Sequence, residues 1–129
     1  MKSIKKTTGD FQVSAVGRYI PERSNSDIPI YFFAYLITIA NNGAISAQLL
    51  NRHWEITDAD GRIHKVDGEG VIGEQPLIKP GNNFEYNSFC PLPTEFGFMK
   101  GYYGMIDQND ADFKIEIPQF RLSIPNSAN

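Results

Sequence analysis

The chain has 129 residues and a formal net charge of −3, with 41% apolar and 21% charged residues. This length predicts a single domain, residues 1–129, because a chain of this size buries about two-thirds of its unfolded surface. The acidic balance argues against a dedicated nucleic-acid binder, which needs clustered Lys and Arg. No apolar run is long enough to span a membrane, and the single cysteine, Cys90, cannot form an intrachain disulfide. We therefore expect a cytoplasmic protein with neither a nucleic-acid partner nor a membrane partner.

Apolar and polar residues alternate along most of the chain, which predicts strands rather than helices. In chain order the expected strands are residues 11–20, 30–40, 83–90, the second half of 95–107, 113–117 and 120–124, with a hairpin at 48–67. The apolar run at 30–40 predicts a central strand that is covered on both faces for part of its length. Residues 21–29 read as a loop, and residues 1–9 and 125–129 as loose tails. Seven to eight strands without a helix predict an all-β immunoglobulin-like or fibronectin type III-like β-sandwich, or a barrel.

Two registers are open for the hairpin, because its turn at residues 58–61 can contain two or three residues. The two-residue Asp60-Gly61 turn sets Trp54 against Asp67. The three-residue turn, with Gly61 in the left-handed position, gives the pairs Ile56 with His64, Glu55 with Lys65, Trp54 with Val66 and His53 with Asp67. We prefer the second register because it separates an apolar face from a face of opposite charges. It places His53 and His64 on opposite faces, so we expect no catalytic residue, metal site or cofactor built on them.

Residues 67–81 hold four glycines and two prolines, and Gly68, Gly70 and Gly73 match the G-x-G-x-x-G pattern of a dinucleotide-binding turn. That turn works only between a strand and a helix, whereas here a hairpin precedes it and Pro76 and Pro80 follow it. A phosphate site also needs a cation, and no Lys or Arg lies between Gly68 and Gly73. We interpret the stretch as a loop that needs positive φ or close backbone approach at three places.

The same loop is the candidate binding site. Its residues are Gly68, Glu69, Gly70, Val71, Ile72, Gly73, Glu74, Gln75 and Pro76. Val71 and Ile72 are adjacent apolar residues between glycines, so at least one is hard to bury in the chain's own core and can form the centre of a small interface. The alternative is that both pack between the sheets and the glycines only permit the bend. Cys90 is expected to be a buried, unreactive side chain.

The sequence resembles the ApaG family along nearly its whole length. The residues that carry the resemblance are 31–39, 48–61, 68–76 and 90–94, with the glycine signature ending in Gln75-Pro76 as the most specific part. The resemblance implies a fibronectin type III-like sandwich in a small bacterial cytosolic protein with no established catalytic residues. It also implies an association with cobalt resistance and magnesium efflux. The same domain occurs in F-box proteins and a polymerase-delta-interacting protein, where it is regarded as a protein-interaction module.

Together these observations predict a non-enzymatic interaction domain that binds a protein partner whose identity the sequence does not give. The alternative is a small-ligand binder, for a pyrophosphate-containing nucleotide or a divalent cation, that uses the loop from Gly68 to Gly73. Within the family this signature has been suggested as a phosphate or nucleotide loop. Whether the chain forms a homodimer is left open.

Overall fold

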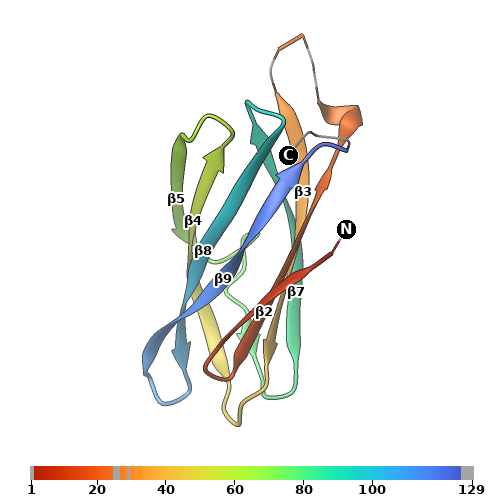
Figure 1. The fold of residues 1–129 in the computed structure, drawn as a ribbon. Coiled ribbons are helices and arrows are strands. Elements are labelled where there is room, and N and C mark those ends of the chain that lie inside the picture. Colours follow the sequence, from red (N-terminus) through yellow and green to blue (C-terminus); the bar gives the residue numbers. More distant parts are fainter. Residues whose placement is uncertain (1, 25–26, 29, 126–129) are drawn as a thin grey trace.

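The computed structural model describes residues 2–24, 27–28 and 30–125, and these fold into two antiparallel sheets packed face to face (Figure 1). One sheet has the order β1-β2-β3-β7, and the other has the order β5-β4-β8-β9 with β6 also paired to β4. The strands are β1 (Ile4–Thr8), β2 (Phe11–Tyr19), β3 (Tyr31–Asn41), β4 (Ala47–Asp58), β5 (Ile63–Glu69), β6 (Leu77–Ile78), β7 (Asn83–Leu92), β8 (Phe96–Asp107) and β9 (Asp112–Ser123). The predicted all-β sandwich is confirmed, with nine strands among the described residues rather than seven or eight.

Helical structure in the described part of the chain is limited to the short 3₁₀ turn η1 (Pro21–Arg23), within the predicted loop at 21–29. Residues 25, 26 and 29 of that predicted loop lie outside the described residues. None of the helical structure described is long and apolar enough to cross a membrane.

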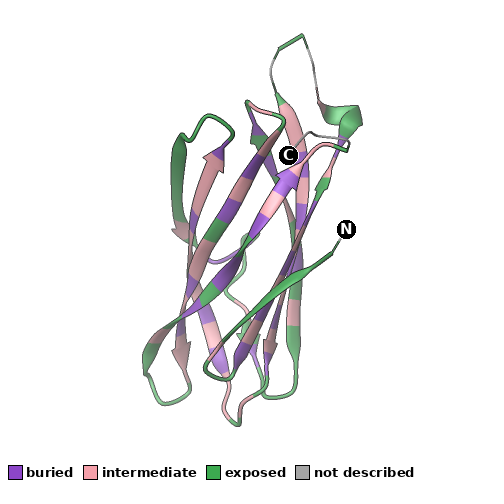
Figure 2. Cartoon of the chain, in the orientation of Figure 1, coloured by how far each residue is buried: buried purple, intermediate pink, exposed green. Residues whose placement is uncertain are grey.

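Strand β3 is central, as predicted, because it lies between β2 and β7. Its inward side chains Phe33, Ile37 and Ile39 are completely buried between the sheets. The expected covering of both faces is wrong: outward residues such as Phe32 and Leu36 stay partly exposed, since only one face of each sheet meets the other sheet (Figure 2). Apolar residues occupy both the inward and the outward positions of β3. The sequence therefore shows a continuous apolar run, although the strand has the ordinary in–out alternation.

Residues 1–9 do not form the loose tail that we predicted, because Ile4–Thr8 pair with β2 as strand β1. The amide of Glu116 in β9 donates a hydrogen bond to Thr8 Oγ1 (3.1 Å), and Lys6 Nζ lies 3.2 Å from Glu116 Oε2. β1 was missed because almost all its side chains are exposed, which leaves no apolar alternation to detect. At the other end, Pro125 is in a turn, and residues 126–129 lie outside the described part.

Two prolines lie inside strands that we predicted to end just before them, at residues 90 and 117. Strand β7 continues through Pro91, and β9 continues through Pro118, so the two predicted strands at 113–117 and 120–124 are one. Both strands lie at sheet edges, where the missing N–H of a proline can face away from the neighbouring strand and cost no hydrogen bond. Pro118 also sits at a register shift, where Met99 pairs with Phe120 but Gly101 pairs with Ile117.

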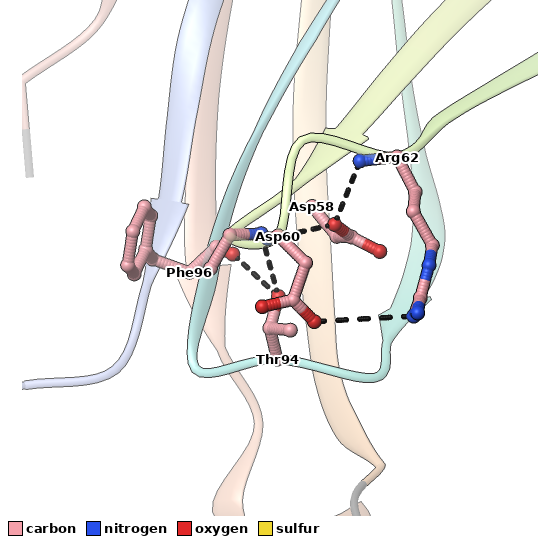
Figure 3. Close-up of polar contacts among 6 residues, drawn as sticks. Asp58, Asp60, Arg62, Thr94 and Phe96 are labelled. Carbon is pink, nitrogen blue, oxygen red and sulfur yellow. Dashed lines mark hydrogen bonds and ion pairs between the residues drawn. The ribbon is translucent and has the colours of Figure 1, made fainter.

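The preferred register of the β4–β5 hairpin is confirmed, with Trp54 opposite Val66 and His53 opposite Asp67. Gly61 has φ +83°, and the buried Asp58 side chain accepts hydrogen bonds from the amides of Asp60 (2.9 Å) and Arg62 (3.1 Å). Figure 3 shows this turn against the β7–β8 turn. There Thr94 Oγ1 accepts from the Ala59 amide (3.0 Å) and donates to the Phe96 carbonyl (2.8 Å). These bonds fix the hairpin tip to the rest of the sandwich.

The two long sides of the sandwich differ. On one side β9 contacts both β1 and β2, which closes the space between the sheets. On the other side β5 pairs only with β4 in the described structure, and its seven residues are exposed apart from a half-buried Gly68. The glycine loop follows β5 on this open side (Figure 1).

Candidate interaction loop

Residues 70–76 form an excursion from one sheet edge rather than a connection between distant strands. Glu69, at the end of β5, lies opposite Asn51, and Leu77, at the start of β6, lies opposite Gln48 on the same strand, β4. Both strands therefore line the same edge of β4, and the chain leaves that edge after Glu69 and returns to it at Leu77. Strand β4 changes register between Leu49 and Asn51, which marks a bulge next to the excursion.

Hydrogen bonds hold both ends of the loop to this bulge. The Leu50 carbonyl accepts from the amide of Gly70 and from the side chain of Gln75, each at 2.8 Å. The Leu49 amide donates to the Pro76 carbonyl at 3.0 Å. The loop is therefore a fixed part of the fold, and its tip is presented in one position.

The tip of the loop is a miniature hairpin. Val71 and Glu74 exchange two backbone hydrogen bonds, of 2.8 and 2.9 Å. Ile72 (φ 45°) and Gly73 (φ 78°) occupy the two central positions, so the turn has the positive-φ pattern of type I′. Gly suits this pattern, whereas a β-branched residue at positive φ is an outlier, because its side chain crowds the backbone.

The structure separates the two alternatives for Val71 and Ile72. Val71 is only 1% exposed and belongs to the core between the sheets, whereas Ile72 is 55% exposed. Leu77, just after the loop, is 58% exposed as well. Val71 thus anchors the loop in the core, as the packing alternative predicted. Ile72 is exposed, as the interface alternative predicted.

Each glycine of the signature has a separate physical reason. A Cβ on Gly70, which has φ +59°, would lie 2.1 Å from the Glu74 carbonyl oxygen. Gly73 needs its positive φ for the turn, and a Cβ on Gly68 would lie 2.6 Å from Arg52 Nη2. The predicted backbone constraint is confirmed at Gly70 and Gly73, whereas at Gly68 the close neighbour is the end of the Arg52 side chain and not backbone. The loop is not a dinucleotide-binding turn, because β6 and not a helix follows it.

Arg52 is the feature that the sequence reasoning missed. It reaches the loop from β4, and its Nη1 donates to the carbonyls of Glu69 and Gly70, both at 2.9 Å. The confirmed register contained the signal, because the pair after His53–Asp67 is Arg52 opposite Gly68. A cation is therefore present at the glycine signature, but it is bound to backbone oxygens of the loop itself.

This arrangement predicts weak binding of nucleotides. The amides of Gly70, Val71 and Glu74 already donate to backbone carbonyls, which leaves few of the N–H groups that form an anion nest. Calorimetry with ATP and with diadenosine tetraphosphate at low salt is expected to give dissociation constants weaker than ~10 μM, which corresponds to about −7 kcal/mol. Tighter binding that is lost in Arg52→Gln would contradict this expectation.

The hydroxyl and thiol groups in the core are held in their protonated forms. The Tyr86 and Tyr103 hydroxyls share a buried hydrogen bond, and burial raises the pKa of both groups. Burial also raises the pKa of the Cys90 thiol to about 12, and the side chain is 3% exposed. Cys90 is thus the packed residue that we expected, since its thiolate is scarce near neutral pH.

The two histidines lie on opposite faces of the hairpin, as the register predicted. His53 Nδ1 lies 2.6 Å from Asp67 Oδ1, and its ring stacks on Tyr102 with centroids 4.7 Å apart. His64 lines a groove on the other face, beside Ile56. Within the described ranges, no group of three or more His, Cys, Asp or Glu side chains is placed to hold a metal ion.

Comparison with known proteins agrees with the resemblance seen in the sequence. Residues 21–107 match the family model of the ApaG domain. A protein ApaG from Azorhizobium caulinodans is 45% identical over 124 residues, covering 96% of this chain and 95% of that protein. One from Methylocella silvestris is 47% identical over 118 residues, covering 92% and 91%. The crystal structure of a putative ApaA protein from Bordetella pertussis superposes with a TM-score of 0.88 at 45% identity, covering 92% of this chain and 96% of that one.

Proposed function

This chain belongs to the ApaG family, and we propose that it is a non-enzymatic interaction module that meets a protein partner through the loop of residues 68–76. The observation that carries the proposal is Ile72, which is 55% exposed at the loop tip with φ 45°. Asn or Gly would occupy that position with less strain. A strained backbone costs about 1–3 kcal/mol and is found mainly where function requires the residue. An apolar side chain held out to solvent at such a cost fits the centre of a binding surface.

The surroundings of Ile72 fit the same role. The acidic residues Glu69 and Glu74 flank the tip and are exposed, and Leu77 adds a second exposed apolar side chain nearby in sequence. An apolar centre with a charged rim is the common composition of a protein interface. The bonds to Leu50 hold the loop in one conformation, so binding loses little conformational entropy.

Replacement of Ile72 by Asn tests the proposal, because it should separate stability from binding. Asn tolerates positive φ, so we expect stability to stay equal or to rise by up to ~1 kcal/mol in urea denaturation. Capture of the partner from native cytosol by the immobilised chain should be lost. Ile4→Asn is the matched control, since Ile4 is 43% exposed but lies on β1, at the opposite edge of the sandwich. Equal capture by both variants and the wild type would reject the loop as the binding face.

The small-ligand alternative has weaker support. Its favourable observation is the Arg52 guanidinium at the signature, and that group already binds the Glu69 and Gly70 carbonyls. As part of the proposal we place the chain in the cytoplasm. Any contribution to cobalt resistance or magnesium efflux then acts through the protein that the loop binds.

A further inference from the structure

The free edge of β5 is a second surface without a partner in the described structure. Strand β5 pairs with β4 on one side only, and its apolar residues Ile63 and Val66 are 57% and 39% exposed. We propose that a second copy of this chain pairs with this edge, β5 antiparallel to β5 about a two-fold axis at Val66. The two five-stranded sheets would then form one continuous sheet across the dimer.

The backbone of β5 has hydrogen-bonding groups available for this pairing. The Arg62 carbonyl and the Gly70 amide both bond to β4, so the alternate residues between them direct their N–H and C=O groups toward β4 as well. Ile63, Lys65 and Asp67 therefore direct their N–H and C=O groups to the free edge. An edge strand of this kind accepts another strand unless charges or bends prevent it.

The charge order of β5 favours one register for the pairing. A two-fold axis perpendicular to the sheet keeps each side chain on its own face. The axis must therefore pass through a residue of β5, since an axis between two residues would set side chains of opposite faces against each other. An axis at Lys65 would set Lys65 against its own copy, and an axis at Asp67 would do the same for Asp67. An axis at Val66 sets Lys65 opposite Asp67 of the second copy, and does so twice. Lys65 forms no ion pair within the described part of its own chain, and Asp67 is 73% exposed.

The same axis would place the loop of the second copy beside the groove on the open side. The groove has a volume of about 490 Å³ and is lined by Ile56, Ile63, His64, Pro91, Leu92 and Pro93, among others. With the axis at Val66, Arg62 of one copy lies opposite Gly70 of the other. The loop tip with Ile72 then lies beside the groove of the neighbouring copy, and its Glu69 and Glu74 lie near Arg62. This part rests on the proposed function, because it takes the loop to be a contact surface and names a second copy as its partner.

Charge exchange tests the register directly. Lys65→Asp sets two acids against each other at both contacts, and Asp67→Lys sets two lysines against each other. We expect wild type to dimerise in sedimentation velocity, and each single variant to dimerise at least about tenfold more weakly. Mixing the two variants should restore a dimer, because the acidic copy now complements the basic copy. The double variant Lys65→Asp with Asp67→Lys should also self-associate.

Thermal melts of each single variant are the folding control, because Lys65→Asp faces Glu55 and Asp67→Lys removes the contact with His53. The mixed sample keeps the test valid even if one variant is less stable. A wild-type chain that stays monomeric up to millimolar concentration would overturn the inference, as would a dimer that neither single variant weakens. A monomer that still captures a different protein, with loss of capture in Ile72→Asn, would overturn the dimer and leave the proposed function standing.

Discussion

Replacement of Val71 by Asp is expected to unfold most of the domain. Val71 is 1% exposed and lies in the core with side chains of both sheets, such as Leu49 and Ile37. A carboxylate there loses its hydration, and the Arg52 guanidinium beside the loop is already bonded to the Glu69 and Gly70 carbonyls, so burial costs several kcal/mol or forces the group to stay protonated. Natural domains are stable by only about 5–15 kcal/mol, so this loss is a large part of the total. Circular dichroism during urea denaturation should show a strongly lowered midpoint or no folded baseline.

The neighbouring residue supplies the control. Ile72→Asp places the same carboxylate one position further on, where the side chain is 55% exposed. Its stability should stay equal or rise by up to about 1 kcal/mol, because the side chain is exposed and Asp, like Asn, tolerates positive φ. If Val71→Asp and Ile72→Asp had equal midpoints, the loop would not be anchored in the core. A fall for Val71→Asp alone would confirm that the loop is part of the folding unit.

The β4–β5 hairpin shows how far local sequence rules reach. The three-residue turn with Gly61, the apolar face of Trp54 and the charged face of His53 together predicted one register, and the structure has that register. The same register already set Arg52 opposite Gly68. Residues 68–73 hold no cation, but the Arg52 side chain of the neighbouring strand reaches the loop. The predicted register, extended by one pair beyond His53 and Asp67, locates Arg52 at the glycine signature.

Other features have no local signal. Strand β1 is stabilised by its backbone pairing with β2 and by contacts to Glu116, which lies more than a hundred positions away in the chain. The continuation of β7 through Pro91 and of β9 through Pro118 depends on their place at sheet edges. Edge positions follow from the order of strands, which no short stretch of sequence contains.

The loop itself lies between these two cases. The sequence identified it and attributed its glycines to backbone constraints, which is correct for Gly70 and Gly73. It could not tell which of Val71 and Ile72 is buried, because a two-residue turn has no periodicity to place side chains on a face. In the structure the loop is bonded to the bulge at Leu50, a contact with another strand that the loop sequence does not contain.

Replacement of Gly70 by Ala is expected to be the most damaging conservative change in the loop. Its φ of +59° alone costs an L-residue roughly 1–2 kcal/mol. The new Cβ would also lie 2.1 Å from the Glu74 carbonyl oxygen, which accepts the hydrogen bond of the Val71 amide. That oxygen is backbone and cannot turn away, so the miniature hairpin must open and withdraw Val71 from the core. We expect a total loss of about 3 kcal/mol or more in urea denaturation.

Gly73→Ala separates the two contributions. Gly73 also has a positive φ, of +78°, but a Cβ there meets nothing within 4 Å. It should therefore cost only the strain of the left-handed backbone, again roughly 1–2 kcal/mol. The difference between the two variants measures the close approach of the two loop strands. Equal losses would show that the loop relaxes around the new Cβ without cost, so that the close approach of Gly70 to Glu74 adds nothing to the stability.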